Sequence, residues 1–476
     1  MKHTDIIQKL NLEQKCALLS GETVFTTRAL PGKGIPAITL SDGPNGVRKQ
    51  AGAADHLGLN PSVPATCFPT SSATACSWDE KLGEAVGEAL GEEAAAQEVA
   101  VLLGPGLNIQ RSPLCGRDFE YFSEDPILAG RMAAAYVRGI QKNGISACPK
   151  HFAVNSQELR RMASDSVLDE RTLRELYLTG FEIVVKEAKP KTIMTSYNLI
   201  NGTYANENAH LLQDILRKDW GFDGAVVTDW GGSNDHALGV KNGSTLEMPC
   251  PGGDSIRELM KAVQGGKISE ADVDARLDEM LELVLSTHAA VEKAPRTFDA
   301  AAHHKLARRA AAESIVLLRN EGGILPLKPN EKLAVIGDFA ETPRYQGAGS
   351  SAVNALQVDT LLDSIKADDS GITLVGYASG FERQGAADAE KLEEAVALAK
   401  KADTVLLCLG LDELRESEGL DRSDMKLAEN QQQLLAAVAA VNPNVVVLLS
   451  AGAPVETPWV GQCRALVYGA LGGQAG

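Results

Sequence analysis

Residues 224–232 have the sequence GAVVTDWGG, an apolar run that ends abruptly in the polar residue Asp229. Apolar runs bounded by turn residues in this way are typical of buried parallel strands. Such runs recur through the first half of the chain and alternate with helical patterns, at the spacing expected of βαβ units around a parallel sheet. The other runs are at 36–44, 99–109, 144–154 and 191–202, and the helical patterns are at 79–98, 125–142, 169–188 and 208–219.

This alternation predicts an α/β fold that begins with a (β/α)8-type, TIM-like barrel. Two helix starts are well signalled, because Asp125 precedes Pro126 and Asp169 precedes an apolar periodicity of three to four residues. The last strands of the barrel are poorly defined, and LEMPC (246–250) is expected to be a degenerate strand. A long helical stretch is predicted over 254–286.

A second α/β region follows, and it is predicted to be a sandwich domain whose parallel or mixed sheet is covered by helices. We expect the barrel to span 1–290, a linker and connecting helix to span 291–330, and the second domain to span 331–476. The connecting helix is predicted over 304–320. Predicted strands are at 332–338, 372–377, 403–411, 444–452 and 464–471, with helices at 386–401 and 429–441.

Composition narrows the class of partner. The chain has 476 residues and a formal net charge of −17, which disfavours nucleic acid and anionic membranes because both require a basic face. No apolar run approaches the ~18 residues of a membrane span, and the N-terminus lacks the apolar core of a secretory signal. The cysteines show no CxxC pair, so we expect free thiols in a reducing, cytoplasmic environment and no metal site. They are Cys16, Cys67, Cys76, Cys115, Cys148, Cys250, Cys408 and Cys463.

Polar residues stand at the predicted strand ends, where barrel enzymes place their catalytic groups. A single polar strand end is usually a helix cap, but a series of them predicts one pocket rich in hydrogen-bonding groups, which suits a polyhydroxylated ligand. The sequence contains no phosphate-binding loop of nucleoside triphosphatases and no motif of zinc proteases or serine hydrolases. A Schiff-base lysine at Lys150 and a pair of catalytic carboxylates both remain open at this point. The strand-end residues are Asp42, Lys150, His151, Tyr197 and Asp229.

Several longer strings resemble glycoside hydrolase family 3, of β-glucosidase type. They occur in order over nearly the whole chain, and several exceed eight residues. They are LSDGPNGVR (40–48), GRDFEYFSEDP (116–126), KHFAVNSQELRRMASDSVLDERTLRELYL (150–178), TSYNLINGTYANEN (195–208), GFDGAVVTDWGG (221–232), and, in the second domain, ILPLKP, YQGAGSSAVN and ESEGLDR (416–422).

The resemblance implies a retaining, exo-acting and cofactor-free hydrolysis that releases terminal β-D-glucose from β-glucosides or short oligosaccharides through a covalent glycosyl-enzyme. It assigns Asp229 as the nucleophile and Glu418 as the general acid/base, whereas the charge-rich loop alone would favour Glu416 almost as strongly. The sugar-binding residues that it implies are Asp42, Arg117, Lys150, His151, Arg161 and Tyr197, with Trp230 as an aromatic wall.

Chemistry adds three expectations. Lys150, with Arg117 or Arg161, should keep Asp229 ionised, and Glu418 should have a raised pKa so that it can donate a proton. Adjacent strand residues point to opposite faces, so Lys150 and His151 can share a pocket only where the backbone departs from a regular strand.

Other activities of the family remain open: β-xylosidase, α-L-arabinofuranosidase and β-N-acetylglucosaminidase, the last disfavoured because its characteristic KHFPGHG-like segment is KHFAVNSQ here. A non-catalytic sugar-binding relative is the alternative from another class. The resemblance also implies that the second domain is incomplete at its C-terminus. A strand near 464–471 would then lack a neighbour, and a homo-oligomer or partner chain would complete the domain.

Overall fold

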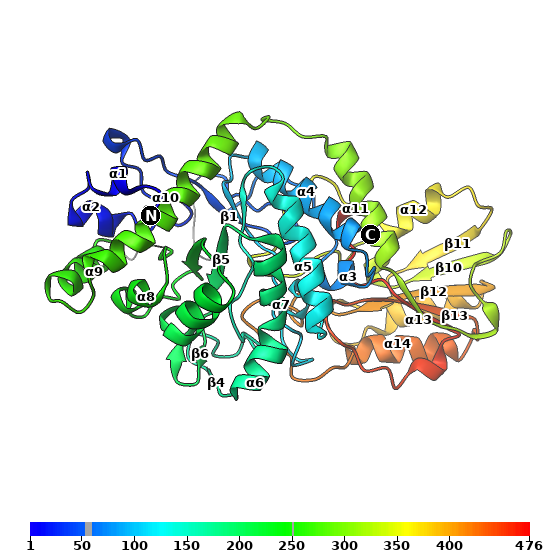
Figure 1. Cartoon of the computed structure of the whole chain (residues 1–476). Coiled ribbons are helices and arrows are strands. Elements are labelled where there is room, and N and C mark those ends of the chain that lie inside the picture. Colours follow the sequence, from blue (N-terminus) through cyan, green and yellow to red (C-terminus); the bar gives the residue numbers. More distant parts are fainter. Residues whose placement is uncertain (53–59, 250–251) are drawn as a thin grey trace.

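The structure is a computed structural model of the chain, and it describes residues 1–52, 60–249 and 252–476. Figure 1 shows a curled α/β body built from the N-terminal part and a second body around a larger sheet, with α10 and α11 passing from one to the other. The predicted TIM-like barrel followed by an α/β sandwich is confirmed.

The barrel is a ladder of short parallel strands. Strand β1 (Leu40–Asp42) pairs with β2 (Val101–Leu103), and β2 pairs with β3 (Ser146–Ala147). Strand β5 (Thr192–Thr195) pairs with β8 (Ala225–Thr228). The two groups are joined because Phe152, beyond β3, bridges to Thr195 in parallel.

Isolated β-bridges connect further short segments that lie between β8 and β1. Leu246 bridges to Val227 and Glu247 bridges to Ser20, both in parallel. The degenerate strand predicted at 246–250 is therefore confirmed at its first two residues, whereas Cys250 lies outside the described residues. Thr26 then bridges to Thr39, directly before β1, so consecutive strand ends face one common centre.

Helices α4 (Glu80–Ala96) and α5 (Pro126–Gln141) form where the sequence predicts them, and Asp125 caps α5 by accepting the N–H groups of Ile127 and Leu128. They pack closely, because a Cβ on Gly87 would lie 2.4 Å from the carbonyl oxygen of Tyr136. The helices predicted at 169–188 and 208–219 contain π-helical turns. These segments are α6 (Glu170–Thr172), η3 (Leu173–Tyr177), α7 (Thr179–Ile183), η4 (Val184–Ala188) and η6 (His210–Asp219).

The helical stretch predicted at 254–286 is wrong as one continuous helix. It consists of α9 (Asp254–Gln264) and α10 (Glu270–Lys293), because Gly266 has a φ of 71° and Ser269 begins α10 with a capping box. The smaller elements of this half are α1 (Thr4–Ile7), α2 (Leu12–Ala17), η1 (Pro31–Lys33), α3 (Ser71–Ala75), η2 (Asp118–Glu120), β4 (Asp165–Ser166), β6 (Leu199–Ile200), β7 (Thr203–Tyr204), η5 (Ala205–Glu207) and α8 (His236–Asn242).

The second sheet has the strand order β11-β10-β12-β13-β14-β9, in which every neighbouring pair is parallel except β14 with β9. Helices α13 and α14 lie along this sheet (Figure 1). The elements are α11 (Ala300–Ser314), β9 (Val316–Asn320), η7 (Glu321–Gly323), β10 (Lys332–Ile336), η8 (Asp338–Ala340), α12 (Leu361–Ala367), β11 (Thr373–Ala378), α13 (Ala389–Ala399), β12 (Thr404–Gly410), α14 (Glu429–Ala439), β13 (Val445–Ser450), η9 (Val460–Gln462), β14 (Ala465–Tyr468) and η10 (Gly473–Ala475).

Strand β9 corrects two predictions. The helix predicted at 304–320 ends at Ser314, and residues 316–320 form a strand instead. That strand pairs antiparallel with β14, whose other side pairs with β13. The prediction that the strand near 464–471 lacks a neighbour is therefore wrong, because the segment assigned to the helix is that neighbour.

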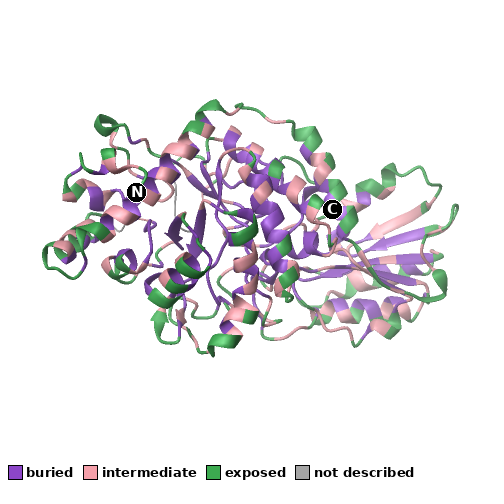
Figure 2. Cartoon of the chain, viewed as in Figure 1, coloured by how far each residue is buried: buried purple, intermediate pink, exposed green. Residues whose placement is uncertain are grey.

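The barrel strands β1, β2, β3, β5 and β8 and the central strands β10, β12 and β13 are mostly buried, whereas the edge strands β9 and β11 are largely partly exposed or exposed. The helices turn their exposed faces outward (Figure 2). Among the described residues, no helix is long and apolar enough to cross a membrane. The described cysteines are unpaired, and all are buried except the partly exposed Cys76.

Candidate active site

The strand ends of the barrel and two loops of the second domain enclose a cavity of about 130 Å³. Every site residue predicted from the sequence lines it: Asp42, Arg117, Lys150, His151, Arg161, Tyr197, Asp229, Trp230 and Glu418. Phe25, Met194 and Ser350 also line it, and the sequence analysis missed them.

Asp229 follows β8 directly and is almost completely buried. The backbone N–H of Trp230 donates to its Oδ1 at 2.7 Å, and Nε2 of His151 lies 3.6 Å from its Oδ2. Burial raises the pKa of Asp229, while the positive charges of Arg161 and Arg117 oppose that increase. The expected cations are therefore present, and each favours the charged form of Asp229, although burial has the larger effect on its pKa.

Lys150 and His151 are neighbours in the sequence, yet both line the cavity. For that case the sequence analysis expects a backbone that departs from a regular strand. The Lys150–His151 and Phe152–Ala153 peptide bonds are cis, and Asn108 holds both backbone polar groups of His151. Burial, together with Arg117 and Lys150, lowers the pKa of His151 well below its ordinary value. His151 is therefore a neutral imidazole at neutral pH, with its Nδ1 3.1 Å from the hydroxyl of Tyr121.

Glu120 lies behind the cavity wall and links two of its cations. Its Oε1 is 3.0 Å from Nζ of Lys150, and its Oε2 accepts from Nε of Arg117 at 2.7 Å. Although burial lowers the pKa of Lys150, the negative charges of Glu120, Asp42 and Glu418 together more than offset it, so the pKa of Lys150 is raised. Lys150 is therefore held as an ammonium donor, which does not suit the Schiff-base hypothesis because that chemistry needs a neutral amine.

Asp42 ends β1 beside Lys150. Burial raises the pKa of Asp42 to about 6, although the positive charges of Lys150 and Arg48 oppose this. The turn after Asp42 requires glycine at position 43, which has a φ of 136° and whose Cβ would lie 1.7 Å from the carbonyl oxygen of Gly46. This turn fixes the position of Asp42 at the strand end.

Glu418 enters the cavity from the loop after β12. Its Oε1 lies 2.9 Å from Nη1 of Arg161 and 3.5 Å from Nη1 of Arg117, and its Oε2 accepts the N–H of Ser350 at 2.7 Å. Burial raises the pKa of Glu418, but the two guanidinium groups and the hydrogen bonds from Ser350 together outweigh burial and lower the pKa far below its ordinary value. The expectation of a raised pKa is therefore wrong for the ligand-free site, where Glu418 is a carboxylate.

Glu416 does not face the cavity. It is fully buried, and its Oε1 accepts the N–H of Gly452 at 2.8 Å. Burial raises the pKa of Glu416 to about 7. Of the two glutamates that the sequence left in competition, the geometry therefore places Glu418 in the cavity and Glu416 in the support of its loop.

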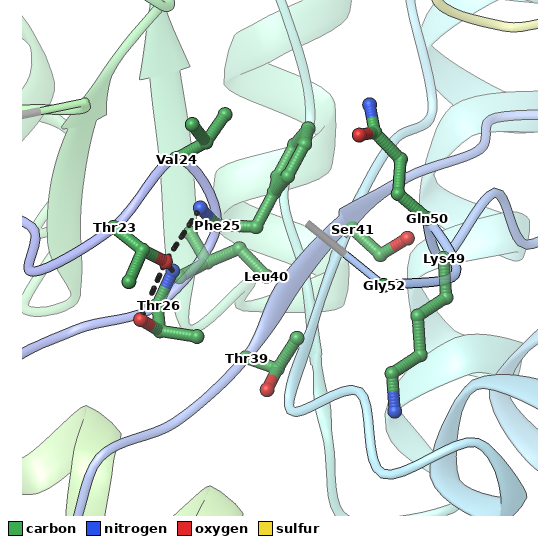
Figure 3. Close-up of a pocket in the computed structure, with 10 residues that line it drawn as sticks. All are labelled: Thr23, Val24, Phe25, Thr26, Thr39, Leu40, Ser41, Lys49, Gln50 and Gly52. Carbon is green, nitrogen blue, oxygen red and sulfur yellow. Dashed lines mark hydrogen bonds between the residues drawn. The ribbon is translucent and has the colours of Figure 1, made fainter. Parts of the chain in front are cut away.

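The aromatic wall of the cavity consists of Trp230 and Phe25, whose ring centroids are 5.4 Å apart. Trp230 is fixed because its Nε1 donates to the carbonyl oxygen of Val24 and because its own carbonyl oxygen accepts from the hydroxyl of Tyr197. Phe25 also borders a second hollow of about 330 Å³, shown in Figure 3. That hollow is lined by Thr23, Val24, Phe25, Thr26, Thr39, Leu40, Ser41, Lys49, Gln50 and Gly52.

Among the described residues, no group of histidine, cysteine, aspartate and glutamate side chains is arranged to hold a metal ion. The side chains that line the cavity offer carboxylates, cationic hydrogen-bond donors and aromatic faces. These groups suit a small ligand that carries several hydroxyl groups and no charge.

Known proteins of similar sequence align with nearly the whole of this chain. "Thermostable beta-glucosidase B" of Acetivibrio thermocellus is 46% identical, and the alignment covers 99% of this chain and 62% of that protein. "Exo-alpha-(1->6)-L-arabinopyranosidase" of Bifidobacterium longum is 44% identical over 99% of this chain and 63% of its own length. The chain thus spans somewhat less than two thirds of these curated relatives.

Solved structures agree with the fold. The Bifidobacterium adolescentis GH3 beta-glucosidase superposes with a TM-score of 0.93 at 42% identity, over 99% of this chain and 67% of that one. Beta-glucosidase 3B from Thermotoga neapolitana in complex with glucose gives a TM-score of 0.89 at 33% identity, over 100% and 72%. Residues 48–283 match the glycosyl hydrolase family 3 N-terminal domain, and residues 315–476 match its C-terminal domain. The chain therefore belongs to glycosyl hydrolase family 3.

Proposed function

We propose that the cavity is the active site of a retaining, exo-acting β-glucosidase in which Asp229 is the nucleophile and Glu418 is the general acid/base. The relatives named above as β-glucosidases support the choice of substrate. The observation that carries the proposal is that these two carboxyl groups, from different domains, border one small cavity lined by hydroxyl-binding side chains.

The size of the cavity supports exo-action. Its volume of about 130 Å³ is well below the roughly 300–1,000 Å³ of sites that hold drug-sized ligands. It fits one sugar ring, so a chain of sugars would enter by its terminal residue. Asp42 would accept hydrogen bonds from hydroxyl groups, Lys150 and Arg161 would donate to them, and Trp230 would contact the apolar face of the ring.

Glycosyl transfer to the enzyme begins at Asp229. Its Oδ1 is held by the N–H of Trp230, so Oδ2 is available to attack the anomeric carbon. The bond from that carbon to the leaving oxygen breaks, and Glu418 transfers its proton to this oxygen. A water molecule then attacks the anomeric carbon of the glycosyl-enzyme while Glu418 takes a proton from the water. The bond from that carbon to the Asp229 oxygen breaks, which releases glucose and restores Asp229 as a carboxylate.

The proton of Glu418 must be gained when substrate binds, because the ligand-free site keeps this carboxyl ionised. Sugar hydroxyl groups that accept from Arg161 and Arg117 would draw both guanidinium groups away from Glu418. The sugar would also exclude water, which favours the neutral acid. Once Asp229 is esterified its negative charge is gone, and Glu418 ionises more easily and serves as the base.

Arabinopyranoside hydrolysis is the second candidate, because a relative of 44% identity carries that activity in its name. A pentose lacks the hydroxymethyl group of glucose, so protein groups that hydrogen-bond to that hydroxyl would be left unpaired. The site would then select against pentosides. Comparison of kcat/KM for aryl β-D-glucoside, β-D-xyloside and α-L-arabinopyranoside decides among them. The proposal expects the glucoside to be preferred; a preference for either pentoside would reject glucose as the substrate.

Two variants test the catalytic roles. Asp229→Ala should lower kcat for nitrophenyl β-glucoside by at least about 10³-fold, since it removes the nucleophile. Glu418→Ala should also be slow, but added azide should restore turnover and yield β-glucosyl azide, the product of retention. The partly exposed Asp424 provides a control, because Asp424→Ala removes a carboxylate from the same loop away from the cavity. Full activity of Asp229→Ala, or α-glucosyl azide from Glu418→Ala, would refute the assignment.

A further inference from the structure

The loop that carries Glu418 is bound to the barrel by a carboxylate of its own. Asp421 accepts hydrogen bonds from barrel backbone: its Oδ1 from the N–H groups of Gly116 at 3.1 Å and Glu158 at 3.0 Å, and its Oδ2 from the N–H groups of Glu158 at 3.0 Å and Leu159 at 2.8 Å. Charged acceptors make hydrogen bonds about twice as strong as neutral ones.

The barrel in turn contributes a carboxylate that accepts a hydrogen bond from the backbone of the loop. The buried Glu158 accepts the N–H of Gly419 on its Oε2 at 2.9 Å, and the same oxygen lies 2.7 Å from Nη1 of Arg161. Asp421 thus holds the backbone of Glu158, while Glu158 holds the backbone beside Glu418. We call Asp421 and Glu158 the reciprocal clamp.

The two barrel segments in the clamp lead directly to the guanidinium groups that touch Glu418. Gly116 precedes Arg117, and Glu158 stands three residues before Arg161 in a tight turn. The approach at Gly116 is close enough to require glycine, because a Cβ there would lie 1.7 Å from the carbonyl oxygen of Leu420. Any shift of the loop relative to the barrel would therefore move Glu418 relative to Arg117 and Arg161 together.

We propose that Asp421 and Glu158 are positioning residues, which hold the loop against the barrel so that the carboxyl group of Glu418 lies where it can transfer a proton. The inference rests on the proposed function, since it assigns the acid/base role to Glu418. Neither carboxylate of the clamp lines the cavity, so both act through other residues: Asp421 through the loop of Glu418, and Glu158 through that loop and Arg161.

Leaving-group dependence tests this role. A dinitrophenyl glucoside departs without protonation, whereas a phenyl glucoside needs the acid. Asp421→Ala should therefore lower kcat/KM for the phenyl glucoside by about 10²-fold, the usual contribution of general acid catalysis, and that for the dinitrophenyl glucoside by less than about threefold. Asp421→Asn, which keeps one acceptor oxygen, should show a smaller loss of the same selectivity, and Asp424→Ala should match the wild type.

Hydrogen exchange of the full chain provides a readout that does not depend on turnover. In Asp421→Ala the amides of Gly116, Glu158 and Leu159 should exchange faster, while in Asp424→Ala they should not. Equal losses on both glucosides, or unchanged exchange at these amides, would overturn the inference. If the wild-type chain hydrolyses no glucoside, the proposed function fails, and the exchange rates still decide whether the clamp holds the loop.

Discussion

Nη1 of Arg161, from the barrel, lies 2.9 Å from Oε1 of Glu418, from the second domain. The same guanidinium lies over the ring of Tyr197, with its central carbon 4.9 Å from the ring centroid. A residue of one domain thus fixes both the position and the charge of the proposed acid of the other. Because this contact favours the carboxylate, the proposed proton transfer by Glu418 is expected only after substrate separates the two groups.

The pH dependence of turnover should reveal this change. In the free enzyme the pKa of Glu418 is depressed, so its protonated form is lost as the pH rises above a low value. Substrate that occupies the arginines raises that pKa. The basic limb of kcat, which reports the complex, should therefore lie at higher pH than that of kcat/KM, which reports the free enzyme. Phenyl glucoside is the suitable substrate because its departure needs the acid; coincident basic limbs would contradict the idea, and Glu418→Ala should lose the limb.

The fold could be predicted from local patterns wherever neighbouring residues determine the structure. Strand ends at Asp42, Tyr197 and Asp229 and the cap at Asp125 follow from such patterns, and the structure places all of them as expected. Residues 316–320 could not be predicted in this way. Their apolar sequence continues a helical pattern, and their strand form depends on pairing with β14, nearly 150 residues away in the chain.

The site shows the same division. Residue types at the strand ends indicated the cavity, and the resemblance to a known family selected Glu418 from a charged loop. The charge state of Glu418 could not be predicted, because it depends on how Arg117 and Arg161 meet it across two domains. Phe25 and Ser350 were missed because neither carries a catalytic signal, although the glycine-rich turn before Ser350 marks a close approach of backbone to Glu418.

Replacement of Asp42 should raise the stability of the fold while it lowers activity. Its pKa is raised to about 6 in the folded protein, so folding binds a proton and the carboxylate destabilises the fold as the pH rises from about 4 through 6. Asp42→Asn should therefore raise the apparent Tm by a few degrees at pH 7.5, corresponding to about 2 kcal/mol, and by little at pH 4. It should also lower kcat/KM for the glucoside by about 10- to 100-fold, because a charged hydrogen bond to the sugar is lost. Scanning calorimetry at both pH values checks the sign, and a lower Tm at pH 7.5 would contradict it.

Lys150 should not form a covalent adduct. Its ammonium lies 3.0 Å from Glu120, whose negative charge keeps it protonated, and a protonated amine cannot attack a carbonyl group. Borohydride added with glucose should therefore leave the mass of the protein unchanged. Lys150→Met should instead raise KM for the glucoside, because it removes a hydrogen-bond donor to the sugar. A mass increase at Lys150 after reduction, absent in Lys150→Met, would revive the Schiff-base hypothesis.

The contact between the domains should depend on Phe119, which is fully buried and faces two glycines of the second domain. A Cβ on Gly347 would lie 2.0 Å from the ring of Phe119, and one on Gly452 would lie 2.3 Å from its Cβ. Phe119→Ala should destabilise the protein by about 3–5 kcal/mol through the cavity that it leaves. It should also lower activity, because Glu120 belongs to the same short helix, η2, and Arg117 is the N-cap residue of that helix.

A double-mutant cycle isolates this contact. Gly347 has no positive φ, so alanine there meets no backbone strain and clashes chiefly with the ring of Phe119. Gly347→Ala alone should therefore cost about 1–3 kcal/mol, the usual cost of overpacking, but it should cost almost nothing when Phe119 is already alanine. Urea unfolding of the wild type, both single variants and the double variant measures the coupling. Additive losses would show that the ring and Gly347 do not oppose each other. They would contradict the expectation that the contact between the domains depends on Phe119.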